Sequence, residues 1–222
     1  MSLRFTWNSA KAQAPSQSVH PILEDPMTQP FRLALAGFLL GSMLIGCDDS
    51  SGPSQGIVVT GTIQNNTQAP IPANARLVVA WVVSSTSPDY TYVFGQGTLD
   101  PTAGTFRVAL DQPPPSQALN GGALGVGIIV ATTNQSIGNG QDISSVPVTE
   151  LIGAAGQYGI IFVTNPGQAA QYRDWAAQFE TGYRVGVGVP VPAEFDRFEP
   201  ASPSSVVLMI DNLENIEFVN WT

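Results

Sequence analysis

Two groups of acidic residues are the candidates for chemistry in this sequence. Glu194, Asp196 and Glu199 alternate with Phe and Arg in the stretch AEFDRFEP, and Asp211 and Glu214 lie in DNLEN. Carboxylate oxygens bind Ca²⁺, and two carboxylic acids can cleave a glycosidic bond as acid and base. These five side chains are therefore the candidates for a calcium or glycan site. The alternative is a solvated loop in which the neighbouring arginine pairs with one carboxylate.

The single cysteine, Cys47, lies where an uncharged run meets two aspartates. That run, Leu33 to Gly46, follows Arg32 and contains no charged side chain. A basic residue, a short apolar segment and small residues are the layout of a secretory signal peptide. The run is also shorter than the roughly 20 apolar residues that span a bilayer. We therefore expect residues 27–46 to be a signal peptide, with an uncleaved membrane anchor as the alternative.

The end of this run has a recognisable pattern. Leu44, Ile45, Gly46 and Cys47 resemble the lipobox of bacterial lipoproteins. The resemblance implies that the Cys47 sulfur carries a diacylglycerol and that the chain is cut just before this residue. Two acyl chains hold a protein stably on a membrane, at about 0.8 kcal/mol for each buried methylene. Residues 47–56 would then be the acylated cysteine and a flexible polar tether.

Residues 1–26 precede the expected signal peptide and are polar. They contain no apolar run, and Glu24 and Asp25 lie where a signal peptide is led by positive charge. A start at Met27 would give a signal of 20 residues before the cysteine. We interpret residues 1–26 either as an upstream over-read of the gene or as a disordered leader, because their composition argues for no fold.

The composition beyond Cys47 excludes several classes of protein. Of the 17 acidic and 8 basic residues of the chain, this part contains 15 Asp and Glu against 5 Arg, with no Lys or His. Such a charge of −10 repels phosphate backbones, so nucleic-acid binding is not expected. Nucleophilic catalysis usually needs His, Lys or a low-pKa Cys, and zinc or haem sites need His or Cys ligands. We therefore expect no enzyme and no bound cofactor, with Ca²⁺ as the one metal that the composition permits.

Short β-branched runs separated by Pro, Gly, Asn and Asp predict a mainly β domain over residues 57–222. The run Arg76 to Val83 is apolar on both faces, which favours a central strand. The sequence from Asp100 to Gly104 is typical of a hairpin turn, with Pro at its second position. The pattern predicts a single antiparallel β-sandwich. The nine expected strands are 57–63, 76–83, 90–99, 105–110, 122–132, 158–164, 183–189, 206–210 and 216–221.

One amphipathic helix is expected over Pro166 to Phe179, where Tyr172, Trp175, Ala176 and Phe179 share one stripe. Asn165 would cap this helix, and Pro166 suits its first turn. A weaker helical turn is possible at Pro147 to Gly153.

Glycines alternate with β-branched residues in two strands. Gly125 and Gly127 form one such pair, and Gly186 and Gly188 form the other. Repeated glycine in a strand indicates that a bulky group approaches closely. Either Trp81 or Trp175 fills these notches, or they form a shallow ligand groove.

The sequence VTGTI opens the β domain, and GQGTL…GTFRVAL forms its predicted hairpin. Together with the lipobox, they resemble immunoglobulin-like or transthyretin-like domains of envelope lipoproteins from Gram-negative bacteria. The resemblance implies a non-catalytic protein that is held on a membrane and faces the periplasm or the cell surface. It implies a structural or binding role and does not name the protein or glycan partner. A carboxylate-based glycan hydrolase and a calcium-dependent adhesion module remain the alternatives.

Overall fold

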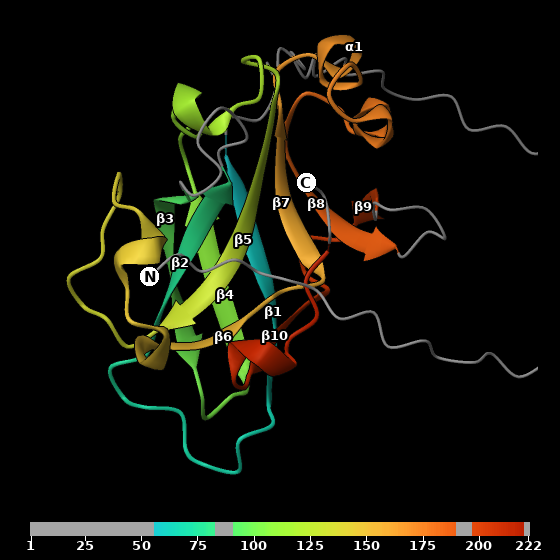
Figure 1. Ribbon diagram of the computed structural model, residues 1–222. Helices are drawn as coiled ribbons and strands as arrows, with labels where there is room; N and C mark the ends of the chain where they lie inside the picture. The colour runs from blue at the N-terminus through green and yellow to red at the C-terminus, as the bar shows by residue number, and fades with distance from the viewer. Residues whose placement is uncertain (1–55, 83–90, 190–196, 220–222) are drawn as a thin grey trace, which may run out of the picture. The chain divides into compact units, whose positions relative to one another are not determined.

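The computed structural model describes residues 56–82, 91–189 and 197–219, which lie within one compact unit, residues 51–222. The described chain is mainly β, and its ten strands belong to one sheet (Figure 1). The expected signal peptide, lipobox and Cys47 lie outside the described residues. The strands are β1 (Ile57–Asn65), β2 (Arg76–Val82), β3 (Thr91–Asp100), β4 (Thr105–Leu110), β5 (Leu124–Thr132), β6 (Leu151–Ala154), β7 (Tyr158–Val163), β8 (Gly182–Val189), β9 (Arg197–Ala201) and β10 (Val206–Ile210).

The sheet closes on itself because β2 pairs with β5. The order β2-β3-β4-β1-β10-β6-β5 returns to β2 through a ladder from Arg76–Thr132 to Trp81–Gly127. Seven strands therefore form a closed barrel. An odd number of strands cannot alternate in direction around a closed ring, and the parallel pair β1–β10 resolves this. The mainly β class is confirmed, whereas the prediction of a β-sandwich is wrong in architecture.

Strand β5 is the point where three further strands leave the barrel. Its second half, at Val130 and Ala131, pairs with β6, and its first half pairs with β7. The residues between β6 and β7 leave the ladder, although the Ala155 N–H still donates to the Ile129 carbonyl oxygen at 2.9 Å. Strands β7, β8 and β9 thus extend to one side of the barrel (Figure 1).

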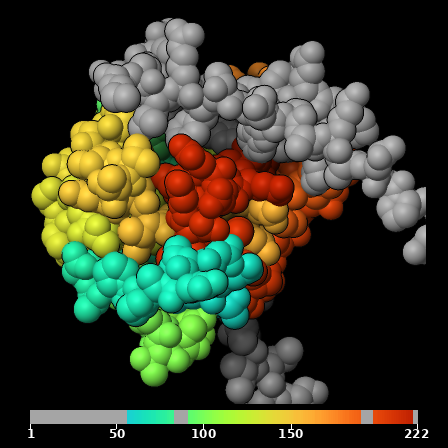
Figure 2. Space-filling view, turned by 60° about the horizontal axis from the view of Figure 1, so that its bottom comes forward, coloured from blue at the N-terminus to red at the C-terminus, as the bar shows by residue number. Residues whose placement is uncertain are grey.

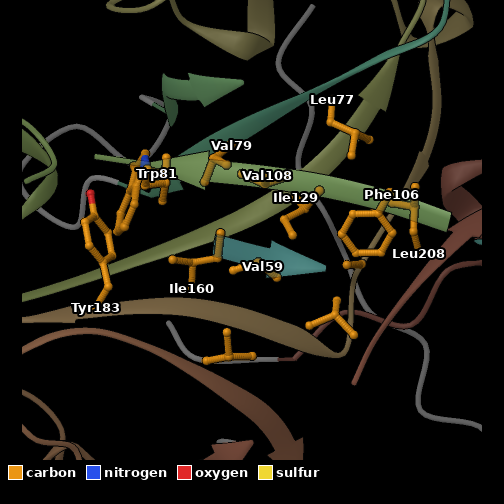
Figure 3. Close-up of a cluster of buried hydrophobic side chains, with 14 of the residues drawn as sticks. Val59, Leu77, Val79, Trp81, Phe106, Val108, Ile129, Ile160, Tyr183 and Leu208 are labelled. Atoms are coloured by element: carbon orange, nitrogen blue, oxygen red, sulfur yellow. The ribbon is translucent and has the colours of Figure 1, made fainter. Parts of the chain in front are cut away.

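The barrel interior is filled by a cluster that we call the inner core. Figure 3 shows Trp81 and Tyr183 together at one end of the labelled cluster, and Phe106 and Leu208 at the other. The Trp81 Nε1–H donates to the Phe94 carbonyl oxygen at 2.9 Å, and the Tyr183 hydroxyl donates to that of Gln112 at 2.7 Å. Burial raises the pKa of the Tyr183 phenol, and the negative charge of Asp111 raises it further. The inner core is closed at this end by large side chains whose polar atoms are satisfied.

Two smaller cores cover the outside of the sheet. The second core lies between β7, β9 and a helical segment, where Trp175 packs edge to face on Phe179 and Phe198 at centroid distances of 5.8 and 5.3 Å. The third core lies between β2 and the segment after β5, where Val78 meets Ile137. Strand β2 is therefore covered on both faces, as its sequence predicts.

The predicted helix is interrupted. Helix α1 covers only Pro166–Ala169, and a 3₁₀ turn follows at Asp174–Gln178 after the extended residue Arg173. The Asn165 side chain caps α1, accepting from the Gln168 N–H at 3.1 Å, as predicted. Because the chain straightens at Arg173, Tyr172 leaves the expected stripe and is 45 % exposed.

Some of the other local predictions are confirmed, and others are wrong. The Asp100 to Gly104 turn joins β3 to β4 as expected, and the weak helical turn after Pro147 is a 3₁₀ turn at Val148–Glu150. Residues 216–219 do not form the last predicted strand. The sequence prediction also missed β6 and β9.

Candidate functional site

The first acidic candidate group is divided between described and undescribed residues. Glu199 lies on β9 and accepts a hydrogen bond from the Arg197 guanidinium at 2.7 Å, with both side chains about half exposed. This pairing agrees with the solvated alternative for that residue. Glu194 and Asp196 lie outside the described residues, so their part in a calcium or glycan site stays a prediction.

The second acidic candidate, Asp211, ties together two loops at one end of the barrel. Its carboxylate accepts hydrogen bonds from the Asn212 N–H at 2.7 Å, the Asn215 amide at 3.0 Å and the Asn66 amide at 3.2 Å. Figure 2 shows the teal loop that carries Asn66 lying against the red segment after β10. The bond from Asn215, then those from Asn212 and Asn66, hold the pKa of the Asp211 carboxyl below its usual range. Glu214 is exposed, and its N–H donates to the Asn212 side chain.

Replacement of Asp211 by Asn should destabilise the domain in a pH-dependent manner. The lowered pKa means that the carboxylate stabilises the fold above the ordinary value of 3.8, and that this stabilisation is lost as the pH falls through the folded-state pKa. We expect D211N to unfold at lower denaturant concentration than the parent at pH 7, with the two midpoints converging in strong acid. Guanidinium titrations across this pH range measure the difference. A midpoint difference that does not change with pH would contradict the proposed role of the charge.

Neither acidic group forms a metal centre in the part of the chain that the structure describes. There, no three His, Cys, Asp or Glu side chains lie close enough to hold one ion. In the same residues, no helix is long and apolar enough to cross a membrane.

The glycine pairs do not form the alternative ligand groove. A Cβ at Gly125 or Gly127 would lie 3.2 or 3.0 Å from ring atoms of Trp81, which occupies this notch. At Gly186 the corresponding space is filled by Ile161 and Phe198, and at Gly188 by Val219. The packing explanation is therefore right, with Trp81 as the expected tryptophan at one pair and other apolar side chains at the second pair.

A surface hollow lies on the outer face of β3, β4 and β1. We call it the hydroxyl depression, and its volume is about 490 Å³. The strand register places Thr98, Arg107 and Thr60 in one row across the three strands, and Asp100, Thr105 and Thr62 in the next. The lining residues are Thr60, Gly61, Thr62, Thr98, Leu99, Asp100, Thr105, Phe106, Arg107 and Ser204.

The charge in this depression is carried by two side chains of opposite sign. The Asp100 carboxylate already accepts from the Ala103 N–H at 2.9 Å within the hairpin turn. Arg107 is exposed, and its guanidinium has no hydrogen bond or ion pair to any residue in the described ranges. The hollow thus offers one uncommitted guanidinium among hydroxyl groups.

A smaller hollow lies beside the same hairpin turn. It has a volume of about 300 Å³ and is lined by Ile63, Asn65, Pro70, Ile71, Pro101, Thr102 and Gly104. Its lining is mostly apolar and contains no charged side chain.

Comparison with protein-family models, curated proteins and solved structures gives no match for this chain. The resemblance to bacterial lipoproteins therefore stays a prediction, whereas the immunoglobulin-like sandwich that it implied is replaced by the barrel. The hydroxyl depression was missed in the sequence because its residues come from β1, the β3–β4 hairpin and the loop before β10, which only the fold brings together. Its signal is the outward alternation of polar residues at Thr60 and Thr62 and at Thr105 and Arg107.

Proposed function

We propose that this chain is a lipid-anchored protein of the bacterial cell envelope, and that its β domain acts by binding rather than by catalysis. The observation that carries the proposal is the position of Cys47. It is the single cysteine of 222 residues and directly follows Leu44, Ile45 and Gly46 at the end of an uncharged run. A diacylated Cys47 would be the first residue of the mature protein and its attachment to the membrane.

Two further features support a binding role. The polar stretch after Cys47 separates the anchor from β1, which begins at Ile57, so the barrel would be presented away from the bilayer. The chain beyond the anchor has no His or Lys to serve as a general base or an activated nucleophile. A closed barrel with three separate apolar cores provides a rigid support for a surface site.

Replacement of Cys47 by Ser should abolish both the lipid modification of the chain and its cleavage before residue 47. In a Gram-negative host, we expect the parent chain to fractionate with membranes and to give an amino-terminal Cys47 peptide with the mass of a diacylglycerol adduct. The C47S variant has no thiol to acylate, so it should lack this adduct and should not be processed before residue 47. Mass spectrometry of the purified protein and of its amino-terminal peptide measures both effects.

The matched control is Ser50→Ala, which changes a nearby polar residue and keeps the thiol. It should retain the acyl adduct and the membrane fractionation. An uncleaved anchor would instead leave the parent free of fatty acid and uncut before residue 47. That result refutes the proposal.

A further inference from the structure

We propose that the hydroxyl depression binds an acidic saccharide, with the sugar carboxylate on Arg107 and the ring hydroxyls on the surrounding threonines. This inference deepens the proposed binding role, on which it rests, by naming the ligand class and the residues that recognise it. It does not depend on the lipid anchor, because the binding surface lies on the barrel.

The arginine side chains differ in whether they have a hydrogen-bond or ion-pair partner. In the described ranges, Arg184 pairs with Glu180 and Arg197 pairs with Glu199. Arg76 donates to the carbonyl oxygens of Asn134 and Ile137, and Arg173 donates to that of Tyr172. Among these five arginines, only the Arg107 guanidinium has neither an ion pair nor a hydrogen bond to the described residues, although the chain beyond Cys47 contains 15 acidic residues. A guanidinium binds a carboxylate through two parallel hydrogen bonds, so it is suited to a carboxylate from outside the chain.

Four threonine hydroxyl groups lie around Arg107 in the two rows. Thr60, Thr62, Thr98 and Thr105 direct their side chains to the same face as Arg107, because they occupy alternate positions in paired strands. None of these four hydroxyls has a hydrogen-bond partner in the described part of the chain. Threonine is β-branched and stiff at χ1, so the hydroxyls are held in place before a ligand arrives. Each can donate and accept, as a sugar hydroxyl requires.

The size and the charge of the depression also suit an acidic sugar. A volume of about 490 Å³ lies within the usual range for small-molecule sites. The single cation and the nearby Asp100 favour a ligand of low charge density, since a polyphosphate would be repelled by the acidic domain. The buried ring of Phe106 and the partly buried side chain of Leu99 give the hollow an apolar floor beneath the polar rows. A sugar ring that bears one carboxylate matches all three properties.

The test is isothermal titration calorimetry on the purified protein in detergent micelles, in whatever processed form the host yields. The probes are an acidic tetrasaccharide of three galactose residues and one galacturonic acid residue, the matching neutral galactose tetrasaccharide, and sodium acetate as a free carboxylate. We expect the acidic tetrasaccharide to bind, and both other probes to bind at least about tenfold more weakly. Arg107→Gln should weaken binding of the acidic tetrasaccharide about tenfold or more, because a charge-assisted pair is removed. The double variant Thr60→Val, Thr105→Val should weaken it severalfold.

Arg197→Gln is the matched control, because it removes the same charge from an exposed strand outside the depression. It should bind the acidic tetrasaccharide as the parent does. Equal binding of the neutral tetrasaccharide overturns the role of Arg107, and equal binding of acetate overturns the role of the sugar ring. Equal weakening by R107Q and R197Q would show general ionic attraction and would also overturn the proposal. Since lipidation is measured separately on Cys47, failure here leaves the anchor proposal standing or falling by its own experiment.

Discussion

Replacement of Trp81 by Ala should lower the free energy of unfolding by about 3–5 kcal/mol, the usual effect of deleting a buried tryptophan. The Trp81 side chain is fully buried and is the largest in the inner core. It fills the space that Gly125 and Gly127 leave open, and its ring lies 6.1 Å from that of Tyr183. Neither glycine has a side chain that could move into the void, so the cavity should persist. The Phe94 carbonyl oxygen would also lose the indole donor.

Guanidinium denaturation followed by circular dichroism measures this effect. Trp81→Phe should destabilise the domain by less than half as much, because the phenyl ring still fills part of the notch and only the donor and one ring are lost. Val148→Ala is the control for truncation of an apolar side chain, since Val148 is 44 % exposed. It should change stability by no more than about 0.5 kcal/mol. Equal midpoints for W81A and V148A would mean that the two glycine positions do not enclose Trp81 as described.

The local sequence pattern predicted the strands well where a residue's own neighbours decide the structure. Strand β2 is apolar at consecutive positions, and such a run is stable only with cover on both faces, which the inner and third cores provide. The Asp100 to Gly104 turn follows from local chemistry, since Gly104 has φ +66° and Asp100 accepts a bond within the turn.

These local patterns could not predict the closure of the sheet. A sandwich and a barrel use the same inward and outward alternation, and they differ only in whether two distant strands pair. Here that pair is β2 with β5, which are separated by two other strands along the chain. Strand β9 was missed because it contains Pro200 and two charged residues, a composition that is common at sheet edges and equally typical of a loop.

The candidate site likewise depends on tertiary structure that local sequence patterns do not reveal. Asp211 and Glu214 were predicted to belong to a calcium or glycan site because they lie close together along the chain. In the fold, the Asp211 carboxylate accepts hydrogen bonds from amide groups of its own loop and of Asn66. The hydroxyl depression combines Thr60 with Thr98 and Arg107, whose proximity depends on the register of β1, β3 and β4. Register between strands is a tertiary property, so this site becomes visible only in the structure.

Replacement of Gly61 by Ala should destabilise the barrel by about 3 kcal/mol, which is large for the addition of one methyl group. Gly61 lies in β1, opposite Val206 of β10 and Phe106 of β4. A Cβ at this position would overlap the Val206 carbonyl oxygen and lie 2.7 Å from the Phe106 ring. The obstacle on one side is backbone, so β10 would have to separate from β1. These two strands form the parallel pair that allows seven strands to close, and the same displacement would therefore open the barrel.

Gly138→Ala is the matched control, because a Cβ there meets no atom closer than the Gln141 side-chain oxygen at 4.0 Å. It should change stability by no more than about 0.5 kcal/mol. Guanidinium midpoints of both variants, followed by circular dichroism, provide the comparison. In hydrogen exchange, G61A should also lose protection first at the amides of β10 and the adjoining part of β1, since their ladder is the one that the methyl group separates. If G61A and G138A unfold at the same midpoint, the close approach of β1 and β10 is wrong, and the closure of the barrel at this pair would have to be abandoned.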